Sequence, residues 1–569
     1  MSAAPAPAIP DEHAFHPQEK MVRWFSPREL ANAGLRVVLS AIFGAYADKR
    51  ELQAALRDPG IVDCAAGDAA WVDYVSDLGD GFHSTYSVAY LLARPELEVT
   101  IGGAPLRLPR GNVLVMGGDE VYPTADVDSY QDRTLGPYRA ALPHSDAPHP
   151  ILLAVPGNHD WYDGLTSFMR IFCQGRWVGG WQTKQTRSYF AVQLPHRWWL
   201  WAIDIQFDTY IDAPQLAYFR DTVAPKLEAG DGIILCSAKP SWVETQKHAE
   251  AYATLDYFER ELVEPHGAHV RMNLTGDTHH YVRYRAADGA TKITAGGGGA
   301  YLSATHHLPT RLDVPPPESV ARGKSDPVTH ELRHTWPSAK GSRTQTLGVF
   351  SLLFKNPSFA FLMGALYALF GWAAVGVERA GLVDTIGEVA WKIARSPFLL
   401  VVILVGRALV GFTKSSGAKR WLVGIAHTAA HLVGVGACVW IAAELVEPSS
   451  RPGRIAFVGV VAVAGAVVGT MVMAAYLYVA DWFGCNTNEV FAAQHLETYK
   501  NFLRLKVDDA GVTVYPIGVE KAWKRWRWPA TWAPGDSAIQ PEGGAGPQHT
   551  LIEEPFVVTR TPEPSGGAA

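Results

Sequence analysis

Short apolar runs that end in polar clusters mark the first half of the chain. Four of them cover Trp71 to Ser76, Val113 to Met116, Ile151 to Pro156 and Val270 to Leu274. Runs of this length next to glycine are typical of strands buried on both faces. Between residues 71 and 309 these runs alternate with helical patterns, which predicts a layered α/β domain.

Further elements of this domain follow from the same pattern. Residues 188–192, 197–204 and 233–237 are predicted strands, and residues 214–227 a crossover helix. Asp288-Gly289 is expected to form the turn of a hairpin.

Long apolar runs dominate the second half of the chain. They cover residues 359–377, 398–412, 421–443 and 455–479, and three of them are near the ~20 residues that a membrane span needs. The second run is shorter and contains Arg407. We therefore expect a helical membrane bundle of about four spans.

Two histidines lie inside the third apolar run. His427 and His431 are one helical turn apart, a spacing that suits either a metal or interhelical hydrogen bonds. We expect hydrogen bonds, because no other histidine or cysteine pair in the bundle completes a metal site.

The basic residues next to the apolar runs indicate an orientation. The loop from Lys414 to Arg420 holds three basic residues, and Lys355 precedes the first run. The positive-inside rule then places the N-terminal domain, this loop and the C-terminus on the cytoplasmic side of a cell membrane. An even number of spans returns the chain to the side on which it started, so the two indications agree.

The segments outside the two main regions are shorter. Ser26-Pro27 predicts the start of a helix, whose apolar face packs on the domain or lies on the membrane surface. After the bundle we expect a helix over 488–505, a hairpin over 507–515 and a basic, aromatic segment over 521–528 that suits an anionic membrane interface. The predicted order is a flexible tail (1–25), an N-terminal helical segment (26–65), the α/β domain (66–312), a linker (313–354), the bundle (355–480), a cytoplasmic helix and hairpin (481–535) and a disordered tail (536–569).

Composition and charge exclude some functions. The formal net charge of −6 gives no reason to expect nucleic-acid binding. The five cysteines are scattered and form no CxxC motif, which fits a reducing compartment. Cys236 is expected to be a buried core residue rather than a nucleophile.

The polar clusters after the four strands carry the candidate chemistry. They are Asp77-Leu78-Gly79-Asp80, Gly117-Gly118-Asp119-Glu120, Gly157-Asn158-His159-Asp160 and Gly276-Asp277-Thr278-His279. Carboxylate, amide and imidazole side chains are poor core material and good metal ligands. Clusters at the C-terminal ends of neighbouring strands predict one metal site at one edge of a sheet.

These motifs, in this order, resemble those of the calcineurin-like metallophosphoesterase superfamily. The resemblance covers residues 71–309 and is specific in combination. It implies a two-sheet sandwich flanked by helices, with two metal ions, manganese, iron or zinc, at the C-terminal ends of the strands.

The resemblance also implies roles for individual residues. Asp77 would bind the first metal, Asp119 would bridge both, and Asn158 would bind the second. His279 would be the last histidine of the GHxH motif, and Asp277 would supply a carboxylate in place of the first. His159, oriented by Asp160, would face the substrate phosphate.

Besides the replacement at Asp277, the chain departs from the usual family pattern at two more motifs. The first motif lacks its histidine, and Gly118-Asp119-Glu120-Val121-Tyr122 is closer to the purple acid phosphatase variant, in which the tyrosine is a ligand. Tyr122 is therefore a candidate ligand, with Asp80 as the alternative. The fourth motif, after residues 233–237, also lacks a histidine, which weakens the second metal site.

The sequence therefore predicts a membrane-anchored, metal-dependent phosphoesterase. Its expected substrate is a phosphomonoester or phosphodiester, with a lipid-linked headgroup as one candidate. The alternative is a degenerate phosphoesterase that acts as a membrane scaffold or sensor. The sequence leaves open whether the protein forms a homo-oligomer.

Overall fold

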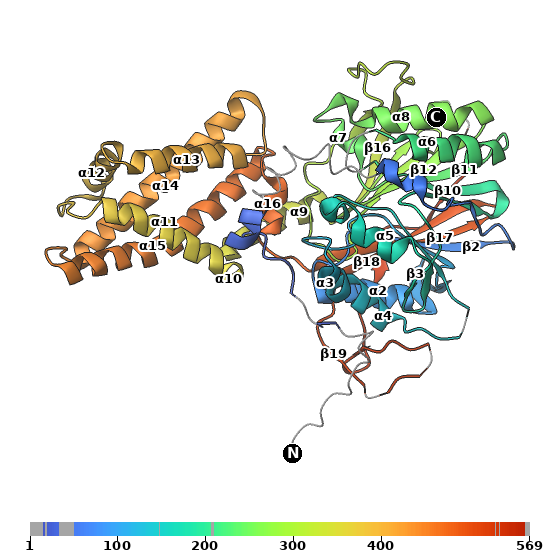
Figure 1. Cartoon of the computed structure of the whole chain (residues 1–569), viewed down its shortest axis with the longest axis horizontal. Coiled ribbons are helices and arrows are strands. Elements are labelled where there is room, and N and C mark those ends of the chain that lie inside the picture. Colours follow the sequence, from blue (N-terminus) through green and yellow to red (C-terminus); the bar gives the residue numbers. More distant parts are fainter. Residues whose placement is uncertain are drawn as a thin grey trace. The chain divides into compact units, whose positions relative to one another are not determined.

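The computed structural model describes residues 15–16, 20–32, 50–146, 148–205, 210–529, 531–533 and 535–563. The chain divides into two compact units (Figure 1). The first consists of Met1–Val22, Phe43–Ala339 and Glu497–Ala569, and the second of Arg23–Ile42 and Lys340–Leu496. The apolar second unit is thus inserted between two parts of the first.

Two large sheets form the first unit. One has the strand order β1 (Val62–Asp63), β9 (Phe190–Leu194), β10 (Trp198–Ala202), β11 (Gly232–Cys236), β12 (His269–Thr275), β14 (Thr291–Ala295), β13 (Tyr281–Ala286), β16 (Val328–Trp336), β15 (Arg311–Val314). The other has the order β21 (Thr550–Leu551), β18 (Gly511–Lys521), β17 (Thr498–Asp508), β2 (Ala70–Val75), β5 (Val113–Met116), β6 (Ile151–Ala154), β8 (Trp181–Thr183), β7 (Trp177–Val178), and β22 (Phe556–Val558) also pairs with β18.

One buried cluster joins the two sheets. Val72, Val115 and Leu153 from the second sheet belong to the same cluster as Leu200 and Met272 from the first. Alternate side chains of these strands therefore point into a shared core, as expected for the predicted sandwich.

Helices cover the outer faces of both sheets. The second sheet packs against α2 (Phe82–Ala93), α4 (Gly136–Ala141) and α5 (Thr166–Phe172). The first packs against α8 (Ala253–Leu262) and the π-helical turn η6 (Tyr218–Val223). The mixed α/β class is confirmed, and so are the predicted strands and the hairpin at Asp288-Gly289.

Shorter elements connect these layers. They are η2 (Arg50–Ala55), β3 (Glu96–Ile101), β4 (Ala104–Pro109), α3 (Val127–Tyr130), η3 (Gln131–Leu135), η4 (Asp160–Asp163), η5 (Pro195–Arg197), α6 (Ala213–Ala217), η7 (Ala224–Lys226), α7 (Ser241–Glu244), η8 (Ala249–Tyr252), η9 (Glu264–His266), β19 (Trp526–Arg527) and β20 (Gln540–Pro541). The crossover helix predicted over 214–227 is confirmed as three short pieces, α6, η6 and η7.

The linker predicted over residues 313–354 is wrong in its first half. β15 and β16 form an antiparallel pair, and β16 continues the first sheet beside β13. The polar, proline-containing composition of this segment concealed an edge hairpin, because exposed edge strands carry many polar side chains.

The C-terminal predictions also need correction. The helix expected over 488–505 ends early, since α16 covers Thr487–Ala492 and β17 begins at Thr498. The predicted hairpin exists as β17 and β18, but it lies inside the second sheet, where β17 pairs with β2 (Figure 1). The predicted disordered tail is wrong up to residue 563, because β21 and β22 pair with β18.

The basic, aromatic segment is also part of the first unit. The Trp526 ring is buried and lies 4.6 Å, between centroids, from that of Tyr86 on α2. Trp528 packs against the same cluster. These rings are core material, so their assignment to a membrane interface is wrong.

The N-terminal segment is described only in part. Residues 27–32 are helical, and the backbone N–H of Glu29 donates to Ser26 Oγ at 3.2 Å, as a helix start requires. Met21, Val22 and Phe25 are buried, so the end of the predicted flexible tail is ordered. The expected apolar face between Leu35 and Phe43 lies outside the described residues.

The second unit is helical. Its elements are α9 (Ala339–Gln345), η10 (Thr346–Ser351), α10 (Leu352–Lys355), α11 (Pro357–Ala373), α12 (Leu382–Ala394), α13 (Phe398–Phe412), α14 (Gly417–Leu445), α15 (Arg451–Trp482) and α16. By length and composition, α14 and α15 are able to cross a membrane. Within the described residues, up to four segments meet this test if two bent pairs each count as one segment, namely α9–α11, bent by 70°, and α12–α13, bent by 99°.

Polar side chains inside the bundle bond to one another. Tyr367 Oη lies 3.0 Å from His431 Nδ1, and His431 Nε2 lies 3.2 Å from His427 Nε2. The first of these hydrogen bonds links α11 to α14, which confirms the prediction of an interhelical hydrogen bond at the histidine pair, and the second lies within α14.

Candidate metal centre

Three aspartates follow parallel strands of the two sheets in the same conformation. Asp77 comes after β2, Asp119 after β5 and Asp277 after β12, with φ angles of 62°, 53° and 65°. The left-handed region is uncommon for residues other than glycine and is found often at functional sites. Each strand therefore ends in a sharp turn that places a carboxylate at the C-terminal end of the strand.

The phenolic oxygen of Tyr122 is the centre of the resulting cluster. It lies 3.0 Å from Asp77 Oδ1, 3.0 Å from Asp119 Oδ2 and 3.1 Å from His279 Nε2. His279 Nε2 is also 3.6 Å from Asp77 Oδ1. The fold thus brings together four of the six predicted metal ligands.

Burial dominates the electrostatics of this cluster. It raises the pKa of the Asp77 carboxyl well above its ordinary value, and the charge of Asp277 raises it further. Burial and the charge of Asp77 do the same to the pKa of Asp119. Burial also lowers the pKa of His279 well below its ordinary value, with a further contribution from Lys500.

The donor set fits a bound metal ion. A phenol has one proton, so Tyr122 donates to one of its two carboxylate neighbours and leaves the other facing an oxygen at 3.0 Å. A cation among these oxygens and the imidazole would neutralise the buried carboxylates. Oxygen and nitrogen donors of this kind suit manganese, iron or zinc.

Glycines permit the close approach of these loops. A Cβ at Gly157 would lie 2.1 Å from Asp119 Oδ1, and one at Gly276 would lie 1.7 Å from Ser76 Oγ. A Cβ at Gly296 would lie 2.6 Å from Asp77 Oδ2. The glycine run at 296–299 packs tightly against the first motif.

His159 lies next to the cluster. Its ring is 4.3 Å from the Tyr122 ring, and its Nδ1 lies 3.0 Å from the carbonyl oxygen of Pro123. Because a carbonyl oxygen only accepts, Nδ1 carries the hydrogen. The backbone N–H of His159 donates to Asp119 Oδ1 at 2.8 Å, which ties the histidine to the predicted bridging ligand.

The Asp160 carboxylate holds two loops of the site together, the GNHD turn and the turn after β5. Its Oδ2 accepts from the backbone N–H of Gly157 at 2.8 Å and of Glu120 at 3.3 Å, and Tyr130 Oη donates to its Oδ1. This buried carboxylate therefore fixes the GNHD turn against the turn that carries Asp119.

The two remaining predicted ligands lie beside the cluster. The amide of Asn158 donates to Tyr162 Oη at 3.2 Å. Asp277 donates its backbone N–H to Asp77 Oδ2 at 3.0 Å, and burial together with Glu244 raises the pKa of its own carboxyl to about 6. These residues border the cluster where the second metal is predicted.

The geometry favours Tyr122 over Asp80 as the metal ligand that replaces the histidine missing from the first motif. Asp80 is fully buried and accepts from the backbone N–H of Val22 at 2.8 Å and of Tyr301 at 3.2 Å. Burial raises the pKa of this carboxyl to about 6. Asp80 therefore holds two loops, whereas the Tyr122 hydroxyl points into the cluster.

The edge after β11 has no imidazole, as its sequence indicates. Ala238 occupies it, and a Cβ at Gly118 would lie 2.8 Å from Ala238 Cβ. Cys236 is buried on β11, and burial raises the pKa of its thiol, so the prediction of a core cysteine is confirmed.

Sequence reasoning missed several residues of the surroundings. Ser76 Oγ donates to Asp77 Oδ2 at 2.9 Å, and Glu120 Oε1 accepts from the backbone N–H of Gly118 at 3.1 Å. Lys500 on β17 is fully buried, its Nζ donates to the carbonyl of Ala300, and burial lowers its pKa to about 8. No sequence motif marks Lys500 as part of the site, because it lies beyond the apolar bundle and far from the four motifs in the sequence.

No protein-family model and no curated protein matches the sequence. The structure of purple acid phosphatase PPD1 isolated from yellow lupin (Lupinus luteus) seeds is similar, with a TM-score of 0.29 and 11% identity over 44% of this chain and 48% of that chain. The structure of PhoD is also similar, with a TM-score of 0.29 and 10% identity over 44% of this chain and 60% of that chain. Each similarity thus concerns less than half of the chain and less than two thirds of the neighbour.

Proposed function

We propose that the protein is a metal-dependent hydrolase of phosphoesters. The carrying observation is the buried cluster of Asp77, Asp119, Tyr122 and His279, whose polar atoms meet within 3.1 Å of the Tyr122 oxygen. The order of the motifs that supply these residues supports the same class.

The residues around the cluster have distinct parts in this proposal. Metal ions held there would polarise phosphoryl oxygens and lower the pKa of a bound water. His159, whose Nδ1 lies 3.0 Å from the carbonyl oxygen of Pro123, would stabilise a phosphoryl oxygen or, when protonated, give a proton to the leaving group. Asp160 keeps His159 in place through the backbone of the GNHD turn.

Membrane anchoring is a further part of the proposal. The apolar helices α14 and α15 support it, with α11 and α13 as candidates for two more spans. Three basic residues between Lys414 and Arg420 favour a cytoplasmic position for this loop and for the hydrolase.

A lipid-linked phosphate headgroup is the substrate that such anchoring favours. The bundle alone now supports this choice, since Trp526 and Trp528 pack in the core of the first unit. Hydrolysis of lipid phosphoesters in mixed micelles, compared with hydrolysis of their water-soluble headgroup analogues by the full-length protein, tests it. Equal kcat/KM for both classes would refute the lipid substrate and leave the hydrolase intact.

Metal content and activity test the hydrolase itself. We expect the full-length protein, purified in detergent, to hold metal and to hydrolyse a chromogenic phosphoester. Asp119→Asn should lose both while its far-UV circular dichroism stays unchanged, because Asp119 contacts Tyr122 and the His159 backbone. An Asp119→Asn protein that keeps its full metal content and activity would refute the assignment of Asp119 as a metal ligand.

A catalytically inactive scaffold or sensor is the second candidate. The contact of Asn158 with Tyr162 and the alanine at the β11 edge favour it, since both weaken the second metal site. A protein that binds one metal per chain and hydrolyses neither monoesters nor diesters would support this candidate.

A further inference from the structure

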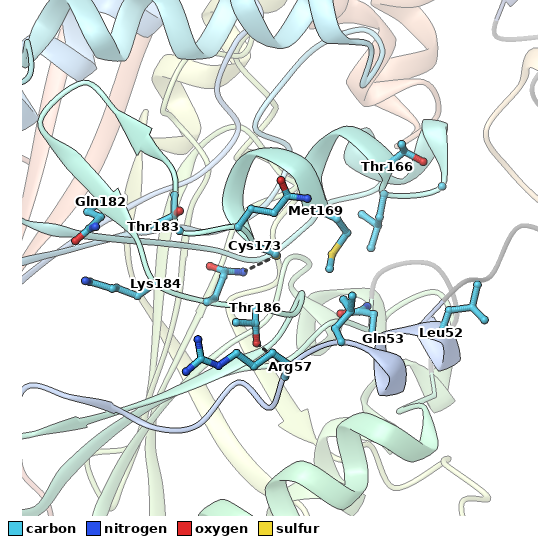
Figure 2. Close-up of a pocket in the computed structure, with 16 residues that line it drawn as sticks. Leu52, Gln53, Arg57, Thr166, Met169, Cys173, Gln182, Thr183, Lys184 and Thr186 are labelled. Carbon is cyan, nitrogen blue, oxygen red and sulfur yellow. Dashed lines mark hydrogen bonds between the residues drawn. The ribbon is translucent and has the colours of Figure 1, made fainter.

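A hollow of about 660 Å³ opens on the first unit, away from the metal ligands. Its walls are η2, the start of α5 and the segment Gln182–Thr186 (Figure 2). None of the predicted metal ligands lines it, so it is a separate feature.

The charged residues that line the hollow are all positive. Its sixteen lining residues include Arg57 and Lys184 and no carboxylate, although the chain as a whole carries a net charge of −6. Among the described residues, neither cation forms an ion pair. Two exposed cations in a depression without acids attract an anion.

Apolar side chains lie on the opposite side of the hollow, together with those of Gln53 and Thr166. Figure 2 shows Arg57, Lys184 and Gln182 on one side, and Leu52 and Met169 on the other. Leu52 is 67% exposed. A ligand with a charged head and an apolar body matches this arrangement better than a bare inorganic anion does.

Hydrogen bonds fix the walls. The Gln185 side chain accepts from the backbone N–H of Ala154 at 2.6 Å and donates to its carbonyl at 2.8 Å, which ties the wall to β6. Thr186 Oγ1 donates to the carbonyl of Arg57 at 2.9 Å, and Gln53 exchanges two hydrogen bonds of 2.8 Å with Ser188. Both cation-bearing segments are therefore held together before any ligand binds, which lowers the entropic cost of binding.

We propose that this hollow binds a small organic anion, with its carboxylate or phosphate head between Arg57 and Lys184 and its apolar body on Leu52 and Met169. The proposal does not depend on the hydrolase activity.

Titration with 4-(trifluoromethyl)benzoate tests it, with the ¹⁹F line width of this probe as the readout. The full-length protein in detergent should broaden the line in a saturable way, beyond the effect of detergent alone. The double variant Arg57→Gln/Lys184→Gln should raise the Kd by about tenfold or more, because two charge-assisted contacts are lost. Leu52→Asn should also weaken binding.

The matched control is Lys226→Gln/Arg322→Gln, which removes two exposed cations outside the hollow and should leave the Kd unchanged. Three results would overturn the proposal. They are equal Kd values for the two double variants, equally tight binding of the neutral 4-(trifluoromethyl)benzamide, and loss of binding in Asp119→Asn, which would assign the anion to the metal centre.

Discussion

Asp73 and Arg504 form a two-pronged ion pair inside the second sheet, although they are 431 residues apart in the sequence. Arg504 Nε lies 2.7 Å from Asp73 Oδ1, and Nη2 lies 2.9 Å from Oδ2. The side chain of Arg504 is 0% exposed and that of Asp73 is 3% exposed. They join β17, which follows the bundle, to β2, which carries the first metal motif.

Replacing one partner of this pair should destabilise the first unit. Arg504→Met leaves Asp73 buried without its counter-charge, and we expect a loss of about 3–5 kcal/mol in the free energy of unfolding. Urea unfolding of the full-length protein, followed by tryptophan fluorescence, measures it. The control Lys506→Met breaks a partly exposed pair with Asp508 on the same strand and should cost about 0–1 kcal/mol. Equal losses would contradict a special role for the buried pair.

Removing the C-terminal strands should also damage the fold. Deletion of residues 536–569 exposes the edge of β18 and removes Glu553, which binds Arg283 and Tyr281. We expect a lower unfolding midpoint or insoluble protein. Deletion of residues 564–569 removes none of these contacts and serves as the control. A 536–569 deletion that unfolds like the full-length protein would show that the tail is dispensable.

Tyr122→Phe tests the phenolic ligand. If the centre contains ferric iron, the phenolate should produce a visible charge-transfer band that this substitution abolishes. Absorption spectra and iron content of the two proteins provide the measurement. An active, colourless wild type whose activity is indifferent to the change would assign the position to water or to another side chain.

Gly157→Ala should disturb the site through a single methyl group. The new Cβ would lie 2.1 Å from Asp119 Oδ1, so the carboxylate must move. We expect loss of metal and of activity, measured as for Asp119→Asn. Gly387→Ala, on a helix with open space around it, is the matched control and should change neither quantity. Full activity of Gly157→Ala would show that the Asp119 position is not critical.

Asp204 should make stability depend on pH. Burial raises its pKa from an ordinary 3.8 to about 7, and its carboxylate accepts from Ser188 Oγ at 2.7 Å and Trp161 Nε1 at 3.3 Å. The folded state then binds this proton more tightly than the unfolded chain, so its contribution is complete below pH 3.8 and is lost as the pH rises to 7. The shift corresponds to up to about 4 kcal/mol.

The comparison of wild type with Asp204→Asn isolates this group. Unfolding midpoints between pH 4.5 and 8 should fall more steeply for the wild type than for the variant. Parallel pH profiles for the two proteins would show that Asp204 titrates in the folded protein as it does in the unfolded chain.

Local signals predicted much of the fold and most of the candidate centre. The strands before Asp77, Asp119 and Asp277 are apolar runs bounded by glycine, so their position and their polar ends could be recognised without the structure. Tyr122 is a candidate only through the resemblance of Gly118-Asp119-Glu120-Val121-Tyr122 to the purple acid phosphatase motif.

Contacts between distant segments could not be predicted. β17 has a helical-looking pattern because it is buried on both faces. The polar stretch before the bundle conceals the edge strand β15 and its neighbour β16. The partner of Asp160 depends on the path of two turns in space, and Lys500 reaches the centre only because β17 pairs with β2. Such pairings depend on tertiary packing, which no local pattern encodes.

The insertion of the bundle between β16 and β17 sets an order of events during synthesis. A ribosome releases the motifs with Asp77, Asp119 and His279 long before it releases β17, since the whole apolar unit is translated in between. Until then Asp73 on β2 has no Arg504, and the site has no Lys500. The first unit must therefore wait, with the edge of β2 unpaired, while the apolar helices leave the ribosome, and a longer wait prolongs the period in which that edge is open to aggregation.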